Sequence, residues 1–478
     1  MFASSARSTE NIPQVAFTTL GCPKNEVDTD LMRRTVEQAG YRTCEYFAEK
    51  PQQVSAVVVN TCSFIQEATE ASIEAIFDAL EVLDRGAADR PAVIVAGCIV
   101  NRYVDDLSSE LPEVAAFIKV GDTDGLVDAL RKCLPPGSPV PLERTADQAR
   151  SYEYLRIADG CDRKCTFCTI PGIRGPYTSR KPEDIIAQAQ ALIDAGTKEL
   201  IVIAQDIGRY GSDFEAIDGK IAPSELLVDL LEELALLPGL KRLRLMYLQP
   251  EGLTDELLDV MARCPAIVPY LEVPLQHVAP RILKAMGRNP RDVASFTVQL
   301  EKARTLMPDL AVRTTLIAGF PGETGEEFAQ LCNFVEDCSF DYVGVFPYSA
   351  EEGTRAAELP NQLDETVRLE RAQTIRDLAD RIGWSRMSER IGQFDEVLIE
   401  GLDEDENVLI ARASFQAPDI DGIVRVAPPV FEGATSVKVD YSQNSYLRVE
   451  FADAILYDME AQVSVRETSS GERGEIDV

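Results

Sequence analysis

Histidine and tryptophan are almost absent from this chain of 478 residues, which has one of each. A metal site that mixes cysteine with histidine would depend on His277 alone, whereas clusters held only by thiolates remain open. Long apolar runs are also missing. No stretch approaches the about 20 apolar residues of a membrane span, and the first segment, MFASSARSTENIPQ, has no apolar run followed by a cleavage site. We therefore expect a cytoplasmic protein.

Positive charge is scarce as well. The chain has 47 Lys and Arg against 80 Asp and Glu, a net charge of −33. A surface that binds phosphates needs clustered Lys and Arg, so this balance disfavours nucleic acid and favours a basic partner. A local basic groove, or a surface adapted to salt, would be compatible with the same total.

Three blocks of different periodicity follow one another, and together they predict an α/β protein. In the first, residues 14–135, short apolar strands alternate with helical segments, which is typical of a parallel α/β sheet. The second, residues 150–388, has six longer strand–helix units and predicts a partial (βα)6 barrel with its chemistry at the carboxyl ends of the strands. We expect residues 1–13 to be a frayed tail, 136–149 a proline-rich linker and 464–478 a disordered tail.

The third block, residues 389–463, has short alternating strands separated by turn signals. This pattern predicts a small β-barrel. With an average of about 100–200 residues per domain, three domains suit the length of the chain. The strands expected in this block are residues 394–401, 407–415, 422–427, 436–442 and 445–451.

Eleven cysteines in a cytoplasmic protein argue for metal binding, catalysis or burial rather than disulfides. Three of them, Cys161, Cys165 and Cys168, form a C-x-x-x-C-x-x-C motif in GCDRKCTFC, directly after the first strand of the second block. Three thiolates can hold three irons of a [4Fe–4S] cluster and leave the fourth iron open. S-adenosylmethionine can chelate such an iron through its amino and carboxylate groups, and one electron can then cleave its carbon–sulfur bond.

Zinc and ferredoxin-type sites suit this motif less well. Zinc would need a fourth ligand, and none lies close by in the sequence. A ferredoxin-type run carries a fourth cysteine before a proline, but Pro171 follows here without one. Chance spacing of three buried thiols is the remaining alternative.

The segment CDRKCTFCTIPGIRG resembles the radical S-adenosylmethionine superfamily and, within it, the methylthiotransferases. The segments AQDIGRYG, VPLQH, TLIAGFPGET and FPYSAEEGT also resemble the barrel segments of this family and occur in its order, so the resemblance covers nearly the whole chain. It implies that Phe167 lies near the adenine of S-adenosylmethionine.

Further candidate residues lie at the ends of the expected strands. Gln205 and Asp206 end the second strand, where they would either bind the methionine or ribose part of the cofactor or cap the strand. His277 ends the fourth strand, and a lone histidine is more often structural than catalytic. The fifth strand ends in three residues that would allow a ligand close to the backbone or form a tight turn, namely Gly319, Pro321 and Gly322.

A second set of cysteines lies in the first block. Cys22, Cys62 and Cys98 each follow a predicted parallel strand, and the carboxyl ends of such strands share one edge of the sheet. Their segments GCPKN, NTC and AGC resemble the cluster ligands of the methylthiotransferase amino-terminal domain. The resemblance implies a second [4Fe–4S] cluster, whose open iron holds the sulfur to be transferred. The other five cysteines are interpreted as core or surface thiols.

The resemblance also implies a mechanism. One S-adenosylmethionine methylates a sulfur on the amino-terminal cluster, and another is cleaved at the barrel cluster to a 5′-deoxyadenosyl radical. The radical removes hydrogen from an unactivated C–H bond, and the carbon radical captures the methylthio group. An external electron donor is required, whereas a general base is not, which suits a chain with one histidine.

The third block resembles a TRAM domain, a fold often used to bind RNA. One branch of the family modifies a transfer RNA adenosine, and another modifies an aspartate of the small-subunit ribosomal protein S-twelve. Residues 394–478 carry 19 Asp and Glu against 6 Lys and Arg, a net charge of −13. A surface of that sign repels phosphate and attracts a basic ribosomal protein. The expected tip of the first hairpin carries four consecutive acidic residues as a docking candidate, Asp403, Glu404, Asp405 and Glu406.

The first two cysteine motifs favour the same branch. GCPKN and NTCSFI resemble the ribosomal-protein branch, whereas the transfer-RNA branch typically has GCQMN and an Arg shortly after NTC, where this chain has Phe64 and Ile65. We therefore expect methylthiolation of an aspartate β-carbon in S-twelve. A transfer-RNA methylthiotransferase is the alternative. An electron carrier or scaffold is disfavoured because such proteins usually supply four ligands per cluster.

Overall fold

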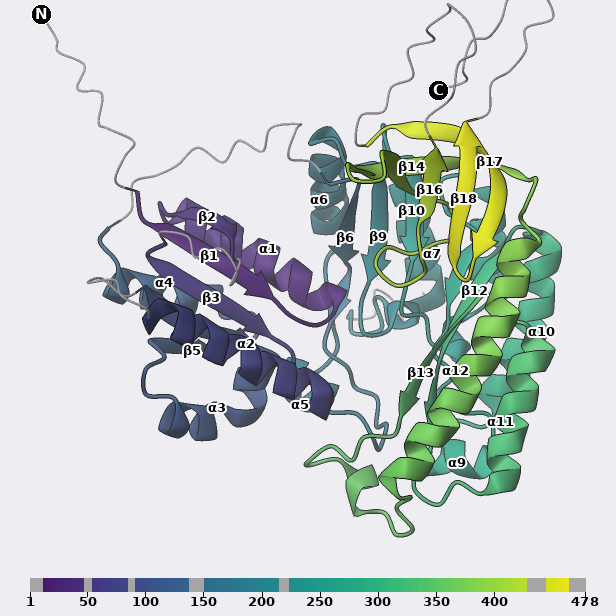
Figure 1. The fold of residues 1–478 in the computed structure, drawn as a ribbon, viewed down its shortest axis with the longest axis horizontal. Coiled ribbons are helices and arrows are strands. Elements are labelled where there is room, and N and C mark those ends of the chain that lie inside the picture. Colours follow the sequence, from purple (N-terminus) through teal and green to yellow (C-terminus); the bar gives the residue numbers. More distant parts are fainter. Residues whose placement is uncertain are drawn as a thin grey trace, which may run out of the picture.

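The computed structural model describes residues 12–46, 54–84, 91–136, 150–214, 223–427 and 444–463. Within them, two α/β parts lie side by side, and a small closed β-barrel covers one end of the second part (Figure 1). This is the architecture that the sequence predicts. Most of the expected tails and linker, and the strand expected at 436–442, lie outside the described residues.

Five parallel strands form the amino-terminal sheet, in the order β2-β1-β3-β4-β5. The central strand β3 is buried throughout, because its alternate residues belong to two apolar clusters, one on each face of the sheet. The elements are β1 Gln14–Thr19, α1 Pro23–Gln38, β2 Arg42–Glu45, β3 Ala56–Thr61, α2 Gln66–Asp84, β4 Ala92–Gly97, α3 Cys98–Glu110, β5 Ala116–Ile118 and α4 Thr123–Cys133.

Six parallel strands form the partial barrel. Two three-stranded groups, β10-β9-β6 and β11-β12-β13, are joined where Leu243 pairs with Ile267. The row of described strands therefore ends at β6 on one side and at β13 on the other, which leaves the ring open between them. The strands are β6 Tyr152–Arg156, β9 Glu199–Ile203, β10 Arg242–Leu245, β11 Tyr270–Glu272, β12 Ala311–Ala318 and β13 Tyr342–Pro347.

Helices cover the outside of this ring, and the last of them, α12, runs beside β13 (Figure 1). A short hairpin and a short helix follow β6. The helices are α5 Ile170–Arg174, α6 Pro182–Asp194, α7 Pro223–Ala235, α8 Asp255–Arg263, α9 Pro280–Ala285, α10 Arg291–Leu306, α11 Gly325–Cys338 and α12 Glu365–Ser388, and the hairpin strands are β7 Ala158–Asp159 and β8 Thr178–Ser179.

The carboxyl-terminal strands close into a barrel in the order β14-β15-β16-β18-β17. Its interior shares one apolar cluster with residues near the beginnings of the partial-barrel strands, among them Tyr270 and Tyr342. The small barrel therefore plugs the end opposite the predicted chemistry. The strands are β14 Phe394–Asp403, β15 Val408–Arg412, β16 Val424–Ala427, β17 Tyr446–Ile455 and β18 Asp458–Val463. Among the described helices, none has the length and apolar character that crossing a bilayer would require.

Candidate functional site

The C-x-x-x-C-x-x-C loop follows the short strand β7 at the carboxyl end of the partial barrel. Gly160 opens it with φ of 72°, and a Cβ there would lie 2.0 Å from the carbonyl oxygen of Pro176, so only glycine fits. Cys161 is then fixed by its N–H, which donates to the Gly175 carbonyl at 3.0 Å. Burial, and after it the neighbouring thiols, raises the pKa of Cys168 to about 12.

The other three predicted ligands lie at the carboxyl edge of the amino-terminal sheet. Cys62 and Cys98 directly follow β3 and β4, and Cys22 precedes α1. Gly21 has φ of 103°, and a Cβ there would lie 2.9 Å from the Cys62 sulfur, so the two loops are closely packed. Burial raises the pKa of Cys98 to about 12, while the nearby Arg174 guanidinium opposes this shift.

Both triads have the chemistry of a thiolate cluster site. Cys22 and Cys62 lie close enough to Cys98 to contribute to the raised pKa of its thiol, and Cys161 and Cys165 contribute in the same way to that of Cys168. Among the described residues, no three His, Cys, Asp or Glu side chains converge tightly enough to hold a single metal ion. Each triad supplies three thiols, which is the donor set that can hold three irons of a [4Fe–4S] cluster. Metal binding would displace the protons that burial otherwise retains.

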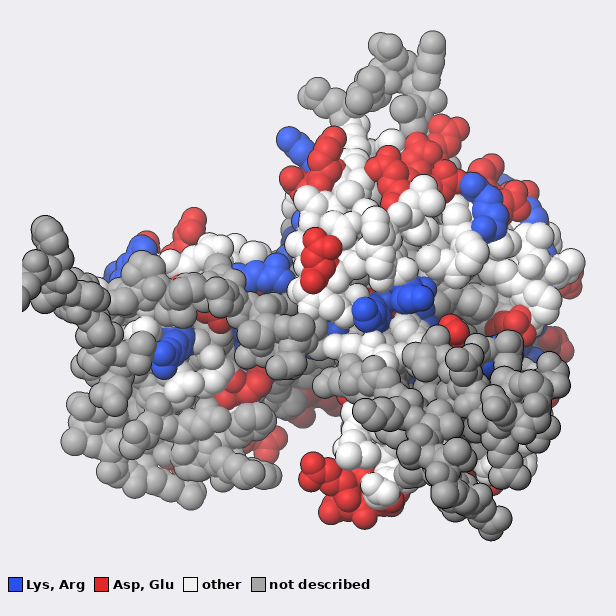
Figure 2. Space-filling model, turned by 90° about the horizontal axis from the view of Figure 1, so that it is seen from above, with Lys and Arg blue, Asp and Glu red and all other residues white. Residues whose placement is uncertain are grey.

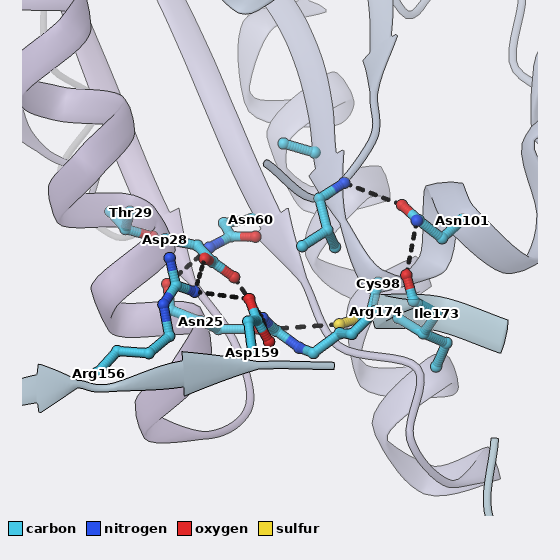
Figure 3. A network of polar contacts seen from close by, with 12 residues as sticks. Asn25, Asp28, Thr29, Asn60, Cys98, Asn101, Arg156, Asp159, Ile173 and Arg174 are labelled. Carbon is cyan, nitrogen blue, oxygen red and sulfur yellow. Dashed lines mark hydrogen bonds and ion pairs between the residues drawn. The ribbon is translucent and has the colours of Figure 1, made fainter. Parts of the chain in front are cut away.

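A buried ionic network joins the surroundings of the two triads (Figure 3). Arg174, at the end of α5, donates to Asn25 at 2.9 Å and to Asp28 at 2.8 Å, both on α1. The same guanidinium contacts Asp159 at 3.2 Å. Arg156 reaches Asp28 at 2.5 Å and Asp159 at 3.1 Å. The helix that follows Cys22 is thus held directly against the segment that follows Cys168.

Asn25 also touches the amino-terminal triad itself. Its side-chain oxygen accepts a long contact of 3.6 Å from the Cys98 thiol, and its amide donates to the Leu20 and Thr61 carbonyls. Lys24, beside it in GCPKN, is buried with its Nζ 2.6 Å from the ring centroid of Tyr247, and burial lowers its pKa to about 7. The GCPKN motif is visible in the sequence. The sequence does not indicate that Lys24 and Asn25 contact Tyr247 and Arg174 of the partial barrel.

Asp206 lies at the predicted position, close to the end of β9, but its carboxylate is engaged by the protein. It accepts from Nε and Nη2 of Arg163, at 3.0 and 2.5 Å, and Arg163 belongs to the barrel cysteine loop. A second oxygen accepts from the Gly208 N–H at 3.1 Å. Asp206 thus tethers the cysteine loop to β9. Gln205 lies next to it and is half-buried.

The residues that end the fifth strand form a tight turn. Gly319 has φ of 76°, and a Cβ there would lie 2.6 Å from the Arg368 side chain, while its N–H donates to Glu323 at 2.9 Å. Gly322 also has positive φ, and Pro321 lies between them. His277 is fully buried, accepts at Nδ1 from the Ala279 N–H and contacts Glu323 at 3.2 Å through Nε2. It is therefore structural, in line with the commoner role of a lone histidine.

A cavity of about 620 Å³ lies between the start of α2 and the open edge of the partial barrel at β13. Phe64, two residues after Cys62, and Phe167, just before Cys168, both line it. The space therefore lies beside the segment that follows Cys62 and beside the cysteine loop of the barrel. Two arginines of α12, Arg368 and Arg376, contribute to its wall, and the sequence did not single them out.

Family models match three segments of the chain. The Radical SAM superfamily matches residues 155–335, the uncharacterized protein family UPF0004 matches residues 14–119, and the TRAM domain matches residues 391–463. Among solved structures, the radical S-adenosylmethionine methyltransferase TsrM from Kitasatospora setae superposes with a TM-score of 0.50 at 16% identity, over 71% of this chain and 74% of that one. This likeness concerns the fold alone.

Two relatives bear the name ribosomal protein uS12 methylthiotransferase RimO. The protein from Anaeromyxobacter sp. (strain K) is 39% identical over 470 residues, which cover 96% of this chain and 95% of its own. The protein from Clostridioides difficile (strain 630) is 37% identical over 463 residues, which cover 94% and 98%. The chain therefore belongs to the uS12 methylthiotransferase family and is a radical S-adenosylmethionine enzyme that uses an iron–sulfur cluster.

Proposed function

We propose that this protein attaches a methylthio group to the β-carbon of an aspartate in ribosomal protein uS12. The observation that carries the proposal is the pair of cysteine triads, held on adjoining parts of a chain that belongs to this family. The cavity beside the segment that follows Cys62 and the barrel cysteine loop supports it, because a substrate side chain bound there would be near both. We propose that the reaction takes place in the cytoplasm, with electrons from an external donor.

We propose two [4Fe–4S] clusters, one on each triad. When bound, these clusters and S-adenosylmethionine would supply the electron transfer, the hydrogen abstraction and the sulfur that the reaction needs. The barrel ligands would be Cys161, Cys165 and Cys168, and the amino-terminal ligands would be Cys22, Cys62 and Cys98.

The remaining side chains would position these groups. Arg163 and Asp206 hold the barrel cysteine loop against β9, and Arg174 holds the two triad regions together. Phe167 would lie beside the adenine, and the turn formed by Gly319, Pro321 and Gly322 would border the cofactor. Burial of the surrounding strand ends would keep water away from the reacting carbon.

The acidic barrel tip is proposed to dock the basic ribosomal protein, with unequal contributions from its four residues. Asp403 accepts from the N–H groups of Asp405 and Glu406 at 3.1 Å and so shapes the turn. Glu406 forms an ion pair with Arg425, which lies 3.6 Å from Asp403. Within the described part of the chain, the side chains of Glu404 and Asp405 are exposed and have no such partner, so they would carry most of the attraction.

The test combines product analysis with iron content. We expect the reconstituted wild-type protein to bind about eight irons and to replace one hydrogen of the uS12 aspartate by a methylthio group, as seen by mass spectrometry. Changing either triad to alanine should remove half of the iron and all of the product. Full iron in a triad variant would refute that cluster site, and methylthiolation of transfer RNA instead of uS12 would refute the proposed substrate.

A further inference from the structure

The cavity between α2 and β13 combines an acidic rim with a positively charged wall. Glu67, Glu70 and Glu365 line it and are exposed, whereas Arg368 and Arg376 line it and are half-buried. Among the described residues, neither arginine forms an ion pair with a carboxylate. This arrangement is unusual in a chain with a net charge of −33, because acidic partners are abundant.

The carboxylates of the cavity are engaged elsewhere or lie at its rim. Glu351 forms an ion pair with Arg102 at 3.1 Å and accepts from the Gln66 N–H at 2.8 Å, which also ties α2 to the partial barrel. Glu365 lies one helical turn from Arg368 on α12, yet the two form no ion pair. Within the described ranges, the two guanidinium charges therefore face the cavity without a counter-ion from the chain.

Both arginines keep unused hydrogen-bond donors. Arg376 donates through Nε and Nη2 to the Val345 carbonyl, at 3.2 and 2.8 Å. Arg368 donates through Nη1 to the Tyr348 carbonyl at 2.5 Å, and its buried Nε has no partner among the residues described. A guanidinium carries five N–H groups in a planar fork. Nη2 of Arg368 and Nη1 of Arg376 donate to no residue that the structure describes. Unpaired donors cost free energy, and a carboxylate bound in the cavity would remove that cost by accepting from them.

The arginines are also placed where a reacting side chain must lie. Arg368, Leu369 and Arg376 line the cavity together with Glu365, at spacings that put them on one face of α12, beside β13 (Figure 1). Phe64 and Phe167 also line the cavity; Phe64 lies two residues after Cys62, and Phe167 directly precedes Cys168.

We propose that Arg376, assisted by Arg368, binds the carboxylate of the substrate aspartate and so orients its β-carbon between the triads. The exposed glutamates of the rim would accommodate the basic surroundings of that aspartate. The proposal rests on the proposed function and adds the specificity-determining residue. The protein would select a carboxylate because a neutral amide, with one acceptor oxygen and no charge, cannot form the bidentate ion pair that a carboxylate forms with a guanidinium.

Binding to two forms of purified uS12 tests this assignment. The reconstituted holoenzyme is titrated with uS12 and with uS12 whose target aspartate is changed to asparagine. We expect the wild-type enzyme to prefer the aspartate form by about tenfold or more, which is the usual worth of a hydrogen bond to a charged group. In the Arg376→Gln variant this preference should vanish, through weaker binding of the aspartate form alone.

Two further variants separate the effect of the guanidinium fork from that of charge on α12. Arg376→Lys keeps the charge but not the fork, so an intermediate preference is expected. Arg381→Gln changes an exposed arginine of the same helix and should retain the full preference. If the Arg376→Gln variant keeps the preference for the aspartate form, or binds both forms of uS12 more weakly to the same extent, then Arg376 does not bind the carboxylate. Either result would overturn the assignment. If the wild-type enzyme binds neither form, the proposed function itself is refuted.

Discussion

At the scale of single residues, Arg174 carries the contact between the two triad regions. Its side chain is 1% exposed and faces Asp28 and Asp159, of which Asp28 is also largely buried. Without Arg174, both carboxylates would keep Arg156 as a partner, but the hydrogen bonds that Arg174 donates to Asp28 and Asn25 would be lost. The sequence does not indicate this role, because Arg174 and Asp28 are far apart along the chain and only the fold brings them together.

We therefore predict that Arg174→Met lowers the free energy of unfolding by about 1.5–3 kcal/mol, the usual contribution of hydrogen bonds to charged groups, as measured by urea denaturation. Arg131→Met provides the control, since Arg131 forms an exposed pair with Asp128 on α4, and such pairs contribute about 0–1 kcal/mol. Equal effects of the two variants would mean that the network in Figure 3 adds no more stability than a surface pair.

At the scale of elements, the small barrel is locked onto the partial barrel by a buried triad of charges. Glu199, the first residue of β9, pairs with Arg244 of β10 and Arg412 of β15, both at 2.7 Å, and all three side chains are buried. Burial alone would raise the pKa of Glu199, but the two guanidiniums outweigh it and lower the pKa from 4.5 to about 2. The ionised form is therefore favoured by folding.

This depressed pKa predicts how stability depends on pH. The contribution of Glu199 is fully present above about pH 4.5 and is lost as the pH falls towards about 2. Glu199→Gln should lower stability by about 3 kcal/mol at neutral pH, because the buried Arg244 loses its ionic partner while Arg412 keeps its ion pair with Glu400. The difference from the wild type should shrink between pH 4.5 and 2, followed by equilibrium unfolding. A constant difference across that window would contradict the assigned charge.

The sequence predicted the strands whose burial produces a clear pattern of apolar residues, and it missed strands in which that pattern is weak. The central strands β3 and β9 are buried and apolar, and the sequence predicts both. Strand β2 was missed because its residues, RTCE, are polar and partly exposed at the edge of the sheet. Strand β18, DMEAQV, was missed for a related reason: it alternates weakly and becomes a strand by pairing with β16 and β17.

The residues of the candidate site were likewise predictable only in part. The ends of the predicted strands indicate where the cysteines lie, so both triads could be proposed from the sequence. The partner of a charged side chain cannot be inferred in this way, because it depends on packing between distant segments. Asp206 was expected either to bind the cofactor or to cap the strand, and its ion pair with Arg163 was not foreseen. The two arginines of α12 line the cavity although their helix showed no special motif.

At the scale of the whole molecule, charge is distributed unevenly. Figure 2 looks from above onto the end that carries the small barrel and shows clusters of Asp and Glu side chains there. Residues 394–478, which are 85 of the 478 residues, carry a net charge of −13 out of the total of −33, so negative charge is concentrated in this part of the chain. Long-range attraction of a basic protein is therefore expected to act mainly through this end, with the cavity near β13 receiving the aspartate.

Reversing the charges of Glu404 and Asp405 at the barrel tip tests whether this end of the molecule attracts uS12 while the cavity near β13 binds its aspartate. We predict that Glu404→Lys with Asp405→Lys weakens uS12 binding several-fold, mainly through slower association, and reduces the salt dependence of the affinity, because exposed charges act over about 10 Å at 0.1 M salt. Asp403 and Glu406 stay unchanged, so the turn and its contact with Arg425 remain.

The matched control is Asp229→Lys with Glu233→Lys, the same charge change on exposed positions of α7. Stopped-flow association at several salt concentrations separates the two variants. If both slow association equally, net charge governs the encounter and the tip has no special role. If the tip variant binds transfer RNA more tightly but uS12 unchanged, the acidic surface excludes nucleic acid rather than recruiting the ribosomal protein. Slower association with the tip variant alone would mean that the small barrel captures uS12 before its aspartate reaches Arg376.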